Sequence, residues 1–349
     1  MKPSYPFWHK THGSWYLVAH GCWAIAILAV FLWRLPNPPM WALSFNTSRM
    51  TYSENMCVHR IHGADRTRPI VVLIGSSQAY SGHFGDRSSL VARLEDKLKH
   101  NIQVYNFAIE GGGIYSLFPV LLDALEFHPD AIIFGTGVRI IANAGEGANR
   151  ASPMITQNLS RLKQHITPEQ YRKLEWHAGS GHSWKEVSAA VVKTNLDLYL
   201  YPRVMNIQQD IRELLYGEAV SKRNYKYPAY SYEMYLKGAG IEDDGWQLME
   251  RAVQLCADRN VPLLLYIMPM PMSGSINCEK REKYESIFVR ELQQMSIAGK
   301  SVVADFSKQI PQAAFYFDNV HLVPKGIDRL ADLITVEFEQ HPEFSHIFK

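Results

Sequence analysis

Residue types that support nucleophilic catalysis occur in two short motifs far apart in the chain. Ser76 and Ser77 directly follow an apolar run and a glycine, and Asp318 stands three residues before His321 near the C-terminus. At the start of a helix this spacing presents both side chains on one face. The histidine can then take the proton of a serine hydroxyl while the carboxylate orients the imidazole. Serine is also a common helix cap, so each motif alone is weak and the hypothesis depends on their combination.

The segments around these motifs predict a parallel sheet. Residues 70–75 begin with a continuous apolar run after Pro69, which is typical of a strand buried on both faces. Similar patterns predict further strands at 102–107, 131–134, 261–268 and 301–306. Helices are expected between them at 88–99, 114–127, 279–298 and 324–340. This alternation predicts an α/β fold with a doubly wound, mostly parallel five-stranded sheet, in which ligands bind beyond the carboxyl ends of the strands.

Residues 140–259 are too long to be one loop and predict a largely helical insert. A cluster of tyrosines within it favours a lid or a groove for a sugar or an acyl chain, and packing inside a helical subdomain explains the cluster equally well. The candidate groove residues are Gln78, Arg139, Asn143, Tyr230 and Tyr232.

Together the motifs resemble the blocks of the SGNH, or GDSL-like, hydrolase superfamily. The run Gly75-Ser76-Ser77 is similar to its first block, Gly111 to the glycine of its second, and Asp318, His321 and Gly326 to its closing block. The resemblance implies a flavodoxin-like fold with Ser77 as the nucleophile of a triad with Asp318 and His321. It also implies an oxyanion hole formed by the backbone N–H groups of Ser77 and Gly111, and no cofactor.

The third block departs from the superfamily pattern. Residues 135–139 read Gly-Thr-Gly-Val-Arg and lack the asparagine that usually follows the third strand. Losing one oxyanion donor lowers the rate by roughly 10²–10³-fold, which argues against a fast, simple esterase. Gly75-Ser76-Ser77 in place of Gly-Asp-Ser, an N-terminal apolar segment and this weak third block together resemble the DltD-type and alginate-O-acetylation-type membrane-anchored acyltransferase proteins. That resemblance implies a membrane-bound O-acyltransferase partner and a cell-envelope glycan or polymer as the acceptor.

The N-terminal segment predicts a membrane anchor. Residues 14–34 begin with a run of 20 residues without Asp, Glu, Lys or Arg, close to the length that spans a bilayer as a helix. A cleavable signal peptide is the alternative, but the run ends in Trp33-Arg34-Leu35-Pro36, a poor cleavage site. We expect a cytoplasmic tail at 1–13, a connector at 35–68 and an extracytoplasmic catalytic domain at 69–349, anchored in a bacterial cytoplasmic membrane.

Net charge, histidine spacing and cysteine positions bear on nucleic-acid binding, metal binding and disulfide bonding. The 349 residues carry a formal net charge of +2 and contain no basic block, which does not favour nucleic-acid binding. Paired histidines, His59 with His62 and His177 with His182, lack a third ligand at a suitable spacing, and we expect no metal site. Cys256 and Cys278 flank one predicted strand and are either disulfide-bonded or reduced core thiols.

Three functions follow from this pattern. The first is extracytoplasmic transfer of an acyl group, of the acetyl or D-alanyl type, to a cell-envelope polysaccharide through an acyl-serine intermediate. The second is a membrane-anchored carbohydrate or lipid esterase that uses the same residues. The third is a non-catalytic module that binds a glycan or a partner protein. The missing asparagine favours this reading, and the intact Ser77, Asp318 and His321 oppose it.

Overall fold

The computed structural model divides the chain into two compact units, Met1–Pro38 and Pro39–Lys349. It describes residues 21–23, 64–80, 89–98, 101–108, 113–142, 163–169, 171, 244–269, 278–315 and 321–348. In the first unit residues 21–23 are helical and Trp23 is exposed. The rest of the anchor expected at 14–34 lies outside the described residues. None of the helices in the described ranges is both long and apolar enough to cross a membrane.

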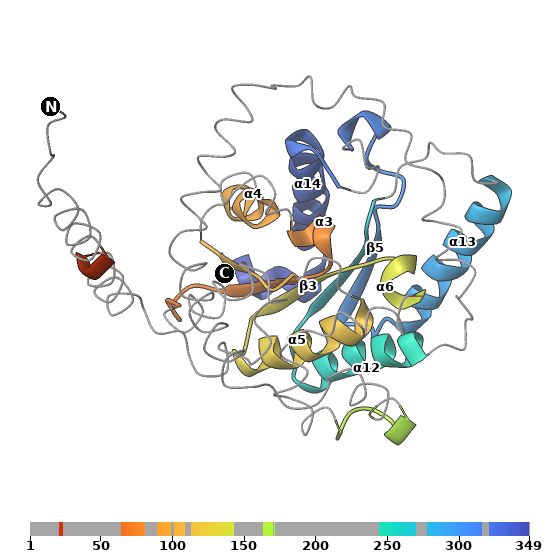
Figure 1. The fold of residues 1–349 in the computed structure, drawn as a ribbon, viewed down its shortest axis with the longest axis horizontal. Coiled ribbons are helices and arrows are strands. Elements are labelled where there is room, and N and C mark those ends of the chain that lie inside the picture. Colours follow the sequence, from red (N-terminus) through yellow and green to blue (C-terminus); the bar gives the residue numbers. More distant parts are fainter. Residues whose placement is uncertain are drawn as a thin grey trace, which may run out of the picture. The chain divides into compact units, whose positions relative to one another are not determined.

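The second unit is built on a five-stranded parallel sheet (Figure 1). Its strand order is β2-β1-β3-β4-β5, and every neighbouring pair runs parallel. The strands are β1 (Ile70–Ile74), β2 (Gln103–Asn106), β3 (Ala131–Thr136), β4 (Leu263–Ile267) and β5 (Ser301–Asp305). All residues of β1, β3 and β4 are buried, as expected for apolar strands covered on both faces. The predicted doubly wound parallel sheet is confirmed.

The strand order determines where a ligand site can form. From β1 the chain passes to β2 on one side, and it later returns to β3 on the other side of β1. In sheets of this order, the crevice beyond the carboxyl ends of the first and third strands is the usual ligand site, because the connections leave there in opposite directions. The segments that follow β1 and β3 therefore border the candidate site.

Helices cover the two faces of the sheet in pairs. Helix α4 (Leu90–Lys97) packs against α14 (Pro324–Gln340), and α5 (Ile114–Glu126) packs against α12 (Asp244–Asp258). Figure 1 shows the two pairs on opposite sides of the sheet. Shorter or more peripheral helices are α3 (Ser77–Tyr80), α6 (Val138–Ala142) and α13 (Cys278–Met295).

Helix α14 has the bounds that the sequence predicts. Pro324 occupies its first turn, where a missing backbone N–H breaks no helical hydrogen bond. Its buried side is an apolar stripe at helical spacing, consisting of Ile327, Leu330, Ala331, Ile334 and Phe338. Helix α12 lies within the range 140–259 and contacts β4 as well as α5. This part of the range therefore belongs to the helical layer on the sheet.

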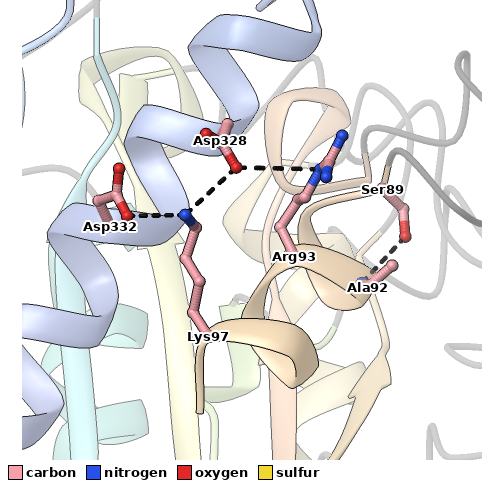
Figure 2. A network of polar contacts seen from close by, with 6 residues as sticks. All are labelled: Ser89, Ala92, Arg93, Lys97, Asp328 and Asp332. Carbon is pink, nitrogen blue, oxygen red and sulfur yellow. Dashed lines mark hydrogen bonds and ion pairs between the residues drawn. The ribbon is translucent and has the colours of Figure 1, made fainter. Parts of the chain in front are cut away.

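Ion pairs join α4 to α14 at the protein surface (Figure 2). Lys97 Nζ lies 3.2 Å from Asp328 Oδ1 and 2.7 Å from Asp332 Oδ1, and Arg93 Nε lies 4.0 Å from Asp328 Oδ1. The hydrogen bond to Asp332 raises the pKa of Lys97 above its ordinary value, burial opposes this effect, and Asp328 adds to it. Ser89 caps the start of α4, because its hydroxyl accepts a hydrogen bond from the backbone N–H of Ala92 at 3.2 Å.

Candidate active site

Ser77 lies where the sequence places it, at the carboxyl end of β1. It is the first residue of α3 and only 5% exposed. The helix turns back closely on Gly75, where an added Cβ would lie 2.7 Å from the Cβ of Ala79. A glycine is therefore required between β1 and the serines. Since Ser77 is already helical, the cap position belongs to Ser76, whose hydroxyl donates a hydrogen bond to Met268 Sδ at 3.6 Å.

The segments that follow β1, β3 and β4 meet beside Ser77. Met268 directly follows β4, and its N–H donates a hydrogen bond to the carbonyl of Thr136 at 2.8 Å. Gln78 Nε2 donates to the carbonyl of Pro269 at 3.0 Å. The residues on both sides of Ser77 thus contact the two consecutive residues that follow β4. Gln78 is 4% exposed, and its assignment to a substrate groove stays a prediction.

The two glycines of the third block have different surroundings. A Cβ at Gly135 would lie 2.5 Å from the hydroxyl oxygen of Tyr266, so this glycine makes room for the tyrosine side chain on β4. Tyr266 is completely buried, which raises the pKa of its hydroxyl, and its ring stacks on Phe306 with centroids 5.9 Å apart. At Gly137, the second glycine of the segment after β3, the nearest described atom to an added Cβ is Met268 Cε at 3.6 Å.

His321 stands three residues before α14 and is held by an ordered turn. Leu322 forms an antiparallel bridge with Phe315, and Val323 N–H donates to the carbonyl of Ala314 at 2.9 Å. A Cβ at Gly326 would lie 2.5 Å from that same carbonyl oxygen, so only glycine permits the close approach. The imidazole is half-buried, with Nε2 inaccessible to solvent.

Two observations put His321 and Ser77 at the same end of the sheet. The segment that carries His321 leaves the carboxyl end of β5 and leads into α14. Helix α14 then runs back to the amino end, where the following 3₁₀ helix, η6 (Pro342–Phe348), brings His346 Nε2 to 3.2 Å from the carbonyl of Asp130, just before β3. The start of α14 is therefore at the carboxyl end, where Ser77 lies.

The other predicted site residues are less completely described. Asp318, Gly111, Asn143, Tyr230 and Tyr232 lie outside the described residues, as do the paired histidines. Arg139 belongs to α6, but its side chain is outside the description. The triad and the oxyanion hole therefore stay predictions. In the second block, Asn106 Oδ1 accepts a hydrogen bond from Ala108 N–H at 3.0 Å, which shapes the start of the segment leading to Gly111.

Cys256 is a free thiol in the core, and burial raises its pKa to about 12. Of the two alternatives for this residue, the reduced core thiol is the one observed. Within the described ranges, no three His, Cys, Asp or Glu side chains are grouped so as to hold a metal ion.

Sequence reasoning missed the role of Met268 and Pro269 beside the serines. The proline after the fourth strand is visible in the sequence, but its partner Gln78 is 191 residues away. No local pattern signals such a contact. The tight packing of Tyr266 on Gly135 was missed for the same reason, since the two residues meet only through the pairing of β3 with β4.

Comparison with known proteins gives a distant structural likeness. No family model matches the chain, and no curated protein matches it. A crystal structure of TesA aligns with a TM-score of 0.42 and 12% identity, covering 80% of this chain and 99% of that one. A carbohydrate acetylesterase family member from Sinorhizobium meliloti aligns with a TM-score of 0.39 and 11% identity, covering 78% and 98%. Likenesses this distant do not assign the chain to a family.

Proposed function

We propose that the chain is an ester-acting enzyme of the SGNH type, with Ser77 as nucleophile and His321 as general base. The observation that carries this proposal is positional. Ser77 begins the first turn after β1, beside the crevice between β1 and β3, and the segment that carries His321 approaches the same end of the sheet. Nucleophile and base on separate segments, assembled beyond the strand ends, suit acyl transfer.

In the proposed reaction, Ser77 Oγ attacks the carbonyl carbon of an ester, and its proton passes to His321. The backbone N–H groups of Ser77 and Gly111 stabilise the oxyanion, and Asp318 orients the imidazole. The C–O bond to the leaving alcohol breaks as His321 returns the proton to that alcohol, which leaves an acyl-serine. An acceptor hydroxyl then attacks the acyl-serine and loses its proton to His321. The bond between the acyl carbon and Ser77 Oγ breaks, and His321 returns the proton to Ser77, so that the acceptor keeps the acyl group.

The acceptor that we propose is a hydroxyl of a cell-envelope polysaccharide or polymer, and the acyl group is of the acetyl or D-alanyl type. Support comes from the sequence: a predicted anchor at 14–34, and glycine at 137 in place of the oxyanion-donating asparagine. A weaker oxyanion hole argues against a fast, simple esterase, although it slows attack on the acyl-serine by water and by a polymer hydroxyl alike. The proposal includes a bacterial cytoplasmic membrane location, an extracytoplasmic domain and a membrane-bound O-acyltransferase partner.

A membrane-anchored esterase is the second candidate. The same Ser77 and His321 serve hydrolysis equally well, with water as the acceptor. The two candidates differ only in what attacks the acyl-serine, so the acceptor must be tested directly.

The first experiment asks whether Ser77 is a nucleophile. The full-length protein in detergent is treated with a fluorophosphonate probe, with Ser77→Ala as the test variant and Ser76→Ala as its matched neighbour. We expect labelling of the wild type and of Ser76→Ala, and none of Ser77→Ala. A folded wild type that is not labelled would support the non-catalytic module instead.

The second experiment supplies p-nitrophenyl acetate with and without a cell-envelope glycan. Transfer predicts that the glycan accelerates nitrophenol release and becomes acetylated, as seen by mass spectrometry. Release that is unaffected by the glycan, with free acetate as the only product, would favour the esterase.

A further inference from the structure

The residues on either side of Ser77 are both fastened to the segment after β4. The hydroxyl of Ser76 donates to Met268 Sδ at 3.6 Å, and Gln78 Nε2 donates to the carbonyl of Pro269 at 3.0 Å. The second contact has the length of an ordinary N–H···O hydrogen bond, whereas the sulfur of Met268 is a weak acceptor. Gln78 therefore makes the stronger of the two attachments.

The acceptor of this hydrogen bond is itself held in place. Met268 continues the pairing of β3 with β4 one residue beyond the strand, through its N–H bond to the carbonyl of Thr136 at 2.8 Å. Pro269 comes next, and its ring restricts the backbone torsion φ. These two constraints hold the carbonyl carbon of Pro269 as a fixed point near the central strands, and the hydrogen bond from Gln78 helps to set the direction of its oxygen.

The helix that carries Ser77 needs such a fixed point. Helix α3 has only four residues, and one isolated turn does not hold its own conformation in water. Gly75 holds it on one side, through the close approach of Ala79. Gln78 supplies the attachment toward β4, and with 4% exposure its amide is shielded from competing water.

We propose that Gln78 is a positioning residue for the nucleophile. Its side-chain amide, bonded to the carbonyl of Pro269, sets the orientation of α3 and hence the direction in which the Ser77 hydroxyl points. Gln78 acts through the backbone and does not touch the substrate, unlike the groove role expected from the sequence. This inference rests on the proposed function of Ser77.

Gln78→Met tests the proposal by keeping the length of the side chain and removing its donor. Misplacement of a reacting group by about 1 Å can lower a rate by about 10²-fold. We therefore expect kcat for p-nitrophenyl acetate, and the rate of fluorophosphonate labelling, to fall by up to about 10²-fold with KM nearly unchanged. A raised KM with normal kcat would overturn the proposal in favour of a groove residue. Normal kcat and KM with only a lower unfolding temperature would overturn it in favour of plain packing.

Gln78→Glu gives a second, independent readout. An ionised carboxylate cannot donate to the carbonyl of Pro269, but a protonated one can. Burial raises the pKa of a glutamate above its usual value of about 4.3, so protonation begins in a mildly acidic range. We expect the labelling rate of this variant, divided by that of the wild type at the same pH, to rise between about pH 8 and pH 5. The ratio cancels any pH dependence that the two proteins have in common. A ratio that does not change with pH would overturn the proposal.

Fluorophosphonate labelling of the wild type distinguishes a failure of the proposed function of Ser77 from a failure of the positioning role of Gln78. A folded wild type that is not labelled at Ser77 overturns the proposed function and this inference with it. A labelled wild type with unaffected Gln78 variants overturns the inference alone. If Gln78→Met does not fold, the pH ratio of Gln78→Glu decides.

Discussion

The two ends of the same sheet use their polar residues differently. At the amino end, side chains bond backbone groups that the strands leave open: Asp130 Oδ2 accepts from Ile70 N–H at 2.7 Å, and Arg66 Nη1 donates to the carbonyl of Phe127 at 2.7 Å. At the carboxyl end, Gln78 and Asn106 also bond the backbone, but Ser77 begins a single helical turn there, and the buried hydroxyl of Thr136 has no hydrogen-bond partner among the described residues.

The polar groups at the amino end mainly stabilise the fold, whereas several at the carboxyl end are placed where a ligand can use them. Polar groups that bond the backbone close off a strand end and make folding more favourable. Polar groups left beyond the strand ends contribute less to folding and are available to a ligand. Substitutions at the carboxyl end should therefore lower activity more than stability, and substitutions at the amino end should lower stability more than activity.

The largest expected effect is on activity at the carboxyl end. Ser77→Ala should abolish acyl-enzyme formation and lower kcat on the order of 10⁶-fold, as loss of a catalytic serine does elsewhere. Its unfolding temperature should stay close to that of the wild type, because the change removes only one oxygen atom. Steady-state kinetics and thermal unfolding on the same preparation test both parts. Normal turnover by Ser77→Ala would exclude this serine as the nucleophile.

Gly326→Ala should affect stability and activity together. The new Cβ would meet the carbonyl oxygen of Ala314 at 2.5 Å, so the turn before α14 must shift. Overpacking of this kind destabilises by about 1–3 kcal/mol, and the shift displaces His321. Urea unfolding measures the first effect and labelling of Ser77 the second. A variant as stable and as reactive as the wild type would mean that the turn adapts without moving the histidine.

Asp130→Ala should show the converse of Ser77→Ala. Removing the carboxylate leaves the N–H of Ile70 without its acceptor, which should destabilise the fold by about 1–2 kcal/mol. Because Asp130 lies at the opposite end of the sheet from Ser77, kcat and KM should be unchanged at temperatures where the variant is folded. A change in kcat would show that the two ends are coupled.

Lys97→Met should have the smallest effect, at most about 1 kcal/mol at low salt, because its ion pairs lie at the surface. The folded-state pKa of Lys97 is raised, so its stabilising contribution is complete below the unfolded pKa. The contribution is lost as the pH rises through the folded pKa. The stability difference between wild type and variant should therefore disappear in strong alkali and shrink in high salt, as denaturant titrations across pH and salt would detect.

Local pattern predicted the long elements because each depends on its own residues. The apolar run 70–74 is a strand in any arrangement that buries both faces, and α14 begins at a proline and carries its own apolar stripe. The short helices α3 and α6 escaped prediction, because four or five residues carry no helical periodicity and their neighbours hold them in place.

By itself, the sequence determined that strands alternate with helices, and that serines end the first strand while a histidine precedes the last helix. These features follow from local periodicity and the positions of glycine and proline. Only the tertiary structure decided that β4 lies two strands from β1, so that Met268 and Pro269 reach Ser76 and Gln78. Those contacts depend on strand order, which joins residues more than 190 positions apart in the chain. The orientation of the proposed nucleophile is therefore a property of the assembled sheet.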